Sequence, residues 1–359
     1  MKKLLTYLLA LPLLLMSCQD NEFDSAPVQE KSASNSTKLT LMELTIDKSK
    51  LHKKNSNKNS DFATQIAALN EALLGHGIQI EKMELLGAEG AGRDVFFSNT
   101  GNKQLEADFV PNDPRNWWPS NPYLGEWTDG SLAYWMDGTE QGTTSGMSED
   151  QTIKAFQSVM NTWGSINCSN GLVLSDQGIT SPTDFGDVGI VQWIVTGGPQ
   201  GNPNAQGYDG TAPGSIVHAG NLGAWFFDII GGPGGGSNIL GVTFTFIWVD
   251  ANGPTDIDNN GKTDVFVREI YMNDGFNWKD APDDVLFNDI YDYETVMLHE
   301  VGHGLSQGHF GKMFGTAANR KLHFAPYALM NAGYTIANRE IIATDSGGHC
   351  SNWAEWPNN

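Results

Sequence analysis

Hydrophobic and polar residues alternate along much of the chain in short runs that predict strands, with a few longer runs of helical period between them. Residues 61–74 place apolar side chains three or four positions apart, which predicts a helix with one buried face. Residues 148–163 predict another, because Ser148 and Gln151 form a capping box before an apolar stripe. A later helix is expected at about 288–305. Strands are expected at residues 38–46, 78–87, 93–99, 132–138, 171–176, 187–195, 239–250 and 265–273.

This order of elements predicts an α+β fold built from two folded units. The boundary is expected at residues 113–123, where three prolines and three aromatic residues fall within eleven positions. A small α/β unit, a candidate propeptide, is expected at 38–112, and a larger domain at 113–359. The polar residues 18–37 are expected to form a disordered tether.

The first residues are typical of an export signal. Lys2 and Lys3 precede an apolar run, residues 4–16, that is too short to span a bilayer. Because the run leads directly to Cys18, residues 1–17 resemble a bacterial lipoprotein signal peptide, removed before a lipidated Cys18. An ordinary signal peptide is the alternative. The acidic residues that follow resemble the surface-export signal of Bacteroidetes lipoproteins, which implies a lipid-only attachment at the bacterial outer membrane or cell surface.

Charge and cysteine count narrow the partners and the metal chemistry. The formal net charge is −21, which disfavours binding to nucleic acid phosphates. Apart from Cys18, the chain has only Cys168 and Cys350, which predict one disulfide in an oxidising compartment; two free thiols are the alternative. Two cysteines are too few for a cysteine-rich zinc module.

The stretch "HEVGHGLSQGH" holds three of the eight histidines in eleven residues. On a helix, His299 and His303 lie one turn apart on the same face, so both rings can reach one metal ion. Glu300 is rotated by about 100° from His299, which suits a general base acting on a metal-bound water. His309 can join them only if the helix ends first, and the flexible Gly304 and Gly308 favour such a turn. Three histidines and an open position are the pattern of a catalytic zinc site.

The spacing H-E-x-x-H followed by a third histidine six residues later resembles the metzincin clan of zinc peptidases, and the order of elements in 113–359 is similar to a matrixin catalytic domain. Ser306 stands where the family has a turn glycine, and Gly308 is expected to take over the turn. Met330, in "APYALMNAGY", matches the methionine turn. Tyr334 lies at the wrong offset from Met330 for a catalytic tyrosine. The resemblance implies a mixed twisted sheet, an active-site helix and a C-terminal subdomain.

The resemblance also implies the chemistry. His299, His303 and His309 would hold Zn²⁺, and Glu300 would be the general base of an endopeptidase that hydrolyses extracellular proteins. Substrate peptides would lie extended along an edge strand, although the sequence does not decide which strand. The alternative is a catalytically decayed, metzincin-fold surface lipoprotein that acts as an adhesin or glycan-binding protein. The intact Glu300 favours the enzyme.

Residues 256–264 form a second candidate metal site, for calcium. Five of them occupy alternating positions of a calcium loop: Asp256, Asp258, Asn260, the carbonyl of Lys262, and Asp264. Val267 stands at the twelfth position, where a glutamate is usual, and Glu269 could replace it only in a different loop. An Asx-rich turn is the alternative.

Two further expectations concern single residues. His218 lies in "SIVHAG", which resembles the structural-zinc loop of matrixins, but the companion motif is missing, so His218 is expected to be a plain loop histidine. If residues 38–112 are a propeptide, the chain offers no cysteine to block the zinc. A carboxylate of Asp108 or Asp113 is then the candidate by position, and a permanent spacer is the alternative.

Overall fold

The computed structural model describes residues 58–88, 104–111, 113, 115, 131–138, 141–179, 189–196, 215–282, 289–315 and 322–358, all within the compact unit Thr37–Asn359. The predicted signal peptide, Cys18, the tether and the strands expected at 38–46 and 93–99 lie outside these residues. Within the described part of the chain, no helix is both long enough and apolar enough to span a membrane.

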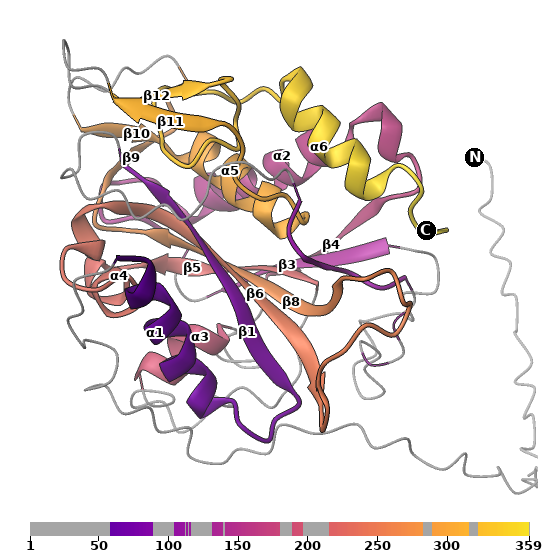
Figure 1. The fold of residues 1–359 in the computed structure, drawn as a ribbon. Coiled ribbons are helices and arrows are strands. Elements are labelled where there is room, and N and C mark those ends of the chain that lie inside the picture. Colours follow the sequence, from indigo (N-terminus) through magenta and orange to yellow (C-terminus); the bar gives the residue numbers. More distant parts are fainter. Residues whose placement is uncertain are drawn as a thin grey trace, which may run out of the picture. The chain divides into compact units, whose positions relative to one another are not determined.

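A mixed β-sheet forms the centre of the fold (Figure 1). Its strand order is β1 (Ile78–Gly87), β6 (Ile239–Asp250), β8 (Thr263–Asn273), β5 (Ile216–Leu222), β3 (Ser131–Met136) and β4 (Val173–Ile179). From β8 to β4 the neighbouring strands are parallel, whereas β6 is antiparallel to β8 and β1 is antiparallel to β6. The short strand β2 (Ala107–Asp108) pairs with β8, and the short strand β7 (Gly253–Pro254) pairs with β6. The α+β class is therefore confirmed.

Helices cover both faces of the sheet (Figure 1). On one face lie α1 (Lys58–Ala72), α3 (Ile190–Thr196) and α4 (Ala224–Gly231), and on the other lie α2 (Glu149–Gly164), α5 (Tyr293–Gly304) and α6 (Ala343–Trp353). Each face has its own hydrophobic core. Because successive side chains of a strand point to opposite faces, Leu86 belongs to the first core and its neighbour Leu85 to the second.

Smaller elements complete the described structure. They are the 3₁₀ turns Asn167–Ser169 and Gly235–Ser237, the parallel pair β9 (Asn277–Lys279) and β10 (Ile290–Asp292), and the antiparallel pair β11 (Lys312–Gly315) and β12 (Leu322–Ala325). A disulfide joins Cys168 to Cys350 with their Cα atoms 5.6 Å apart. It ties α6 to the turn that follows α2, as the cysteine count predicts.

The strand predicted at 187–195 is wrong, because the structure has α3 there instead. Residues 190 to 195 are all buried, so the run carries no amphipathic period that could distinguish a helix from a strand. A distant side chain stabilises the helix: the buried carboxylate of Glu269 accepts the N–H groups of Ile190, at 2.6 Å, and Val191, at 3.2 Å. These first amides have no partner within a helix. Glu269 therefore serves α3 and not the calcium loop.

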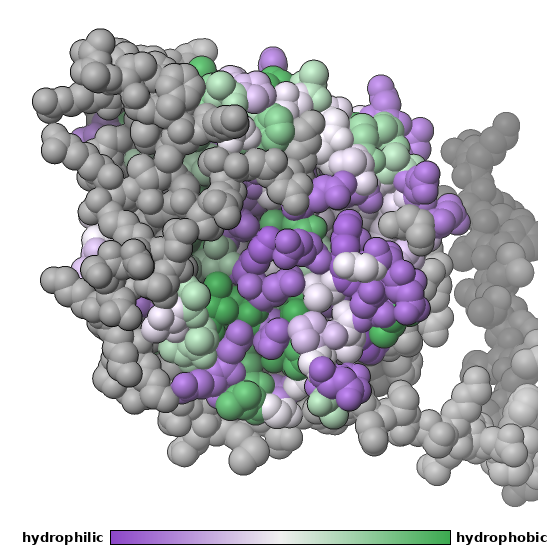
Figure 2. All heavy atoms as spheres, viewed as in Figure 1, coloured by the Kyte–Doolittle hydropathy of each residue, from purple (hydrophilic) through white to green (hydrophobic). Residues whose placement is uncertain are grey.

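The described part of residues 38–112 is not a separate unit, which corrects the predicted boundary. β1 pairs with β6 from Ile78↔Trp248 to Gly87↔Ile239, and Leu69 of α1 packs in the same core as α3 and α4. The strand supplies side chains to both cores of the main sheet and so has no core of its own. On the face drawn in Figure 2, the described surface is mostly hydrophilic with scattered hydrophobic side chains.

Candidate metal centre

Helix α5 carries the first two histidines, and the charged side chain of Asp292 caps its N-terminus. It starts at Tyr293, later than predicted, because Asp292 ends β10 and caps the helix, its side chain accepting the N–H of Thr295 at 3.0 Å. Arg339 donates to the same carboxylate at 2.8 Å. Burial acts to raise the pKa of Asp292, but the hydrogen bonds from Arg339 and Thr295 outweigh burial and lower that pKa. Farther along, the Trp163 indole N–H donates to Leu298 O at 3.0 Å. This last bond fixes the helix against α2.

The chain leaves α5 through a left-handed turn at Ser306, whose φ is 65°. The N–H of Ser306 donates to His303 O, and that of Gln307 donates to Gly302 O, both at 3.0 Å. This is a Schellman motif with serine at the position that favours glycine. Gly308 is not among the residues with positive φ, so the expectation that Gly308 takes over the turn is wrong. The turn brings His309 back toward the helix.

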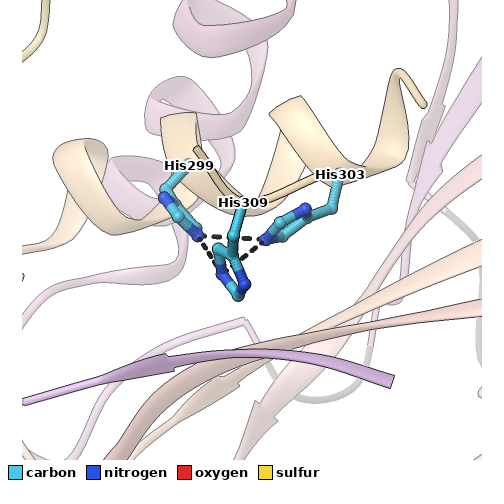
Figure 3. A group of neighbouring side chains, drawn as sticks. All are labelled: His299, His303 and His309. Carbon is cyan, nitrogen blue, oxygen red and sulfur yellow. Dashed lines mark hydrogen bonds between the residues drawn. The ribbon is translucent and has the colours of Figure 1, made fainter. Parts of the chain in front are cut away.

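The three histidine side chains meet at their Nε2 atoms (Figure 3). The Nε2 atom of His303 lies 3.0 Å from that of His299 and 3.2 Å from that of His309, and the remaining distance is 3.3 Å. In a tetrahedral site with Zn–N bonds of about 2.0–2.1 Å, two ligand nitrogens lie about 3.3 Å apart. The spacing therefore fits one tetrahedral zinc ion.

The protonation of the rings also fits a cation. Every Nδ1 atom faces an acceptor: Leu329 O at 2.8 Å from His299, Gln307 O at 2.7 Å from His303, and Glu84 Oε2 at 3.1 Å from His309. In a neutral ring, the Nδ1 atom then carries the proton and the Nε2 atom carries a lone pair. Three lone pairs thus converge on one point without a proton between them. Such an arrangement repels itself unless a positive ion occupies the centre.

Burial keeps two of these rings neutral. His299 and His303 are almost completely inaccessible. Burial, assisted by the neighbouring His309, lowers the pKa of His299 to about 3 and that of His303 well below its ordinary value. The neutral imidazole is the form that binds a metal ion.

Glu300 lies beside the histidines, and only one of its two carboxylate oxygens has a hydrogen-bond partner among the described residues. Thr243 of β6 donates its hydroxyl to Oε2 at 2.6 Å, whereas Oε1 has no hydrogen-bond partner among the described residues. Burial raises the pKa of Glu300 well above its ordinary value, with the nearby Glu84 adding to the effect. A side chain at Gly241 would put its Cβ atom 2.9 Å from Oε1, so glycine at this position makes room for the carboxylate.

Met330 lies directly beneath the helix, against Gly302. A Cβ atom on Gly302 would come 2.3 Å from Met330 Sδ, so the two residues are packed as closely as glycine allows. Asp345 of α6 holds this segment by accepting the N–H of Leu329 at 2.9 Å and that of Met330 at 3.1 Å. Because Leu329 O in turn accepts from His299, Asp345 orients the His299 ring indirectly. Sequence reasoning missed Asp345, which carries no local signal.

Tyr334 lines the same pocket as His299, but its hydroxyl is engaged by the backbone before α5. Its hydroxyl accepts the N–H of Asp292 at 3.2 Å, and its ring packs against Tyr291. It is a buried structural residue at the start of α5, consistent with its unsuitable offset from Met330.

Asp108 and Asp113, the candidates to block the zinc if residues 38–112 are a propeptide, are paired with cations instead. Asp108 contacts Lys262 Nζ at 3.0 Å, and Asp113 contacts the Arg115 guanidinium at 2.6 Å. The residue that does reach the histidines from the N-terminal part of the chain is Glu84 of β1. Burial acts to raise the pKa of Glu84, but the hydrogen bond and charge of His309 outweigh it and lower that pKa.

His218 is not a loop histidine, because it lies in β5 and is completely buried. Its Nε2 atom is 3.4 Å from the Tyr293 hydroxyl, and its ring packs on Phe156. Burial lowers its pKa to about 3. Burial in the first core therefore favours the neutral ring.

The predicted calcium loop has the hydrogen bonds of the Asx-turn alternative. Asp256 accepts the N–H groups of Asn260 and Gly261, both at 3.0 Å. Asp264 forms an ion pair with Arg115 at 2.8 Å. One oxygen each of Asp256, Asp258 and Asp264 still lies within 4.8 Å of the others. Calcium binding stays a prediction.

No protein-family model matches the chain, and no curated protein matches it in sequence.

Proposed function

We propose that the protein is a zinc-dependent endopeptidase of the metzincin type, held at the bacterial surface by a lipid on Cys18. The observation that carries the proposal is the convergence of three Nε2 lone pairs at the spacing of a tetrahedral zinc site, with the carboxylate of Glu300 next to them. The antiparallel β6 beside α5 and Met330 beneath the helix support the metzincin resemblance.

The chain's own residues would divide the work of peptide hydrolysis. His299, His303 and His309 would hold a zinc ion, which would supply a Lewis acid and lower the pKa of a water molecule toward about 7. Thr243 holds Oε2 of Glu300, so Oε1 is free to take a proton from the attacking water. Glu300 then passes that proton to the nitrogen of the leaving amine. Hydrogen bonds to the three Nδ1 atoms keep the ligand rings oriented throughout.

The test is the hydrolysis of casein by the purified protein and its Glu300→Gln variant at equal zinc. Glutamine keeps the size of the side chain and cannot accept the proton, so we expect zinc to stay bound and the rate to fall by about 10²–10⁴-fold. A variant that cleaves as fast as the parent would remove Glu300 from the mechanism. A parent that binds zinc and cleaves no protein would favour the decayed surface lipoprotein instead.

A further inference from the structure

β1 lies along the strand that faces the reactive group. Thr243 and Gly241 of β6 touch the carboxylate of Glu300, and β1 pairs with these same two residues through Glu84 and Leu86. β1 therefore covers the outer edge of β6 at the position of the metal centre. Figure 3 shows a strand passing close to His309, where Glu84 makes its contact.

The same residues of β1 are also held on their other side. Gly87 pairs with Gly333 in parallel, and its carbonyl accepts the N–H of Tyr334 at 3.0 Å. The end of β1 thus lies between an antiparallel strand and a parallel segment that follows Met330. Main-chain pairing of this kind is how an extended peptide binds at a sheet edge.

The side chains of this segment point where those of a bound peptide would point. Leu86 is 2% exposed and lines a pocket whose other walls include His299, Thr295 and Ile336. Leu85 points to the opposite core. An apolar side chain beside His299, with main-chain pairing on both sides, is the arrangement that an extended peptide bound in a cleft would also have.

We propose that residues 83–87 of β1 are a built-in occupant of the peptide-binding cleft, and that an extended peptide with a leucine-sized apolar residue takes the place of Leu86 when the site acts. This inference rests on the proposed function. Glu300 is fully buried against Thr243 and Gly241, the residues of β6 that pair with this end of β1, so substrate reaches it only after this end of the strand leaves β6. Ile78 and Ile80 anchor the beginning of β1 in the second core, and that part stays in place.

The first test uses a fluorescent peptide with the sequence of residues 80–88, "IEKMELLGA", and protein carrying Glu300→Gln, so that no catalysis is needed. Fluorescence anisotropy should show binding about tenfold tighter when Leu86→Asp is added, because the internal occupant is weakened. Leu74→Asp, at a 76% exposed site, is the matched control and should change nothing. A peptide with aspartate in place of its second leucine should bind about tenfold more weakly.

The second test locks the strand in place. Leu85 and Val242 are directly paired and point away from the site, so Leu85→Cys with Val242→Cys can form a cross-strand disulfide. We expect the oxidised form to bind the peptide about tenfold more weakly than the reduced form and to cleave casein about tenfold more slowly. The parent protein under the same reductant is the control.

Equal peptide binding and equal cleavage by the oxidised and reduced forms would overturn the inference and make β1 a permanent strand, while leaving the proposed peptidase intact. A Leu86→Asp protein that binds the peptide yet, with Glu300 restored, cleaves nothing would instead fault the proposed function.

Discussion

Ser306 shows how one residue type can differ from a family pattern without losing the geometry that the pattern provides. Its left-handed conformation costs a side-chain-bearing residue on the order of 1–2 kcal/mol, and its buried hydroxyl has no hydrogen-bond partner among the described residues. Ser306→Gly should therefore raise the free energy of unfolding by about 0.5–1 kcal/mol, since greater freedom of the unfolded glycine offsets part of the gain. Urea denaturation at fixed zinc measures this difference.

The matched variant is Ser306→Val, whose branched side chain resists the left-handed region and should destabilise the protein. If glycine lowers the stability and valine does not, the turn is not as strained as its φ of 65° indicates.

The buried His218 gives a pH dependence that does not involve the metal centre. Burial lowers its folded pKa to about 3, whereas an unfolded histidine titrates near 6.5. Between these values the unfolded chain binds the extra proton, so stability is present above about pH 6.5 and is lost as the pH falls toward 3. As the pH falls through this window, the free energy of unfolding of a His218→Asn variant should decrease by about 1.4 kcal/mol less per pH unit than that of the parent. Identical slopes for parent and variant in denaturation at pH 4.5–6 would show that His218 does not titrate on unfolding.

At the scale of elements, α5 depends on close packing against Met330. Gly302→Ala would push a methyl group into Met330 Sδ and against the Trp163 ring. We expect a loss of about 1–3 kcal/mol in the free energy of unfolding, even though alanine favours helices more than glycine does. Adding Met330→Ala should remove most of this extra cost, which a double-mutant cycle measures. Additive effects of the two substitutions would mean that the two residues do not press on each other.

Elements with a strong local pattern were predictable from sequence, and those decided by distant partners were not. The capping box at Ser148 is present in α2, and the helix predicted at residues 61–74 is observed as α1, which begins earlier, at Lys58, and ends at Ala72. The apolar run at 190–195 became α3 because Glu269, far along the chain, meets its first amides. A continuous apolar run has no period by which either outcome could be chosen.

At the scale of the whole molecule, the site residues were predictable because their spacing in the chain nearly fixes their geometry. His299 and His303 are one turn apart on any helix, and a turn after Gly304 is enough to return His309. The placement of β1 over this site was not predictable, since the pairing of Leu86 with Gly241 joins residues far apart in sequence. The support that Asp345 gives to Leu329 and Met330 was missed for the same reason.

The central claim is that His299, His303 and His309 hold one zinc ion, and elemental analysis of the purified protein tests it most directly. We expect about one zinc per chain in the parent, and in a Glu300→Gln control whose ligands are intact. A His303→Ala variant should contain almost none, because two neutral imidazoles are too few ligands for a stable site. Full zinc content in the His303→Ala variant, or none in the parent after dialysis against zinc, would contradict the account.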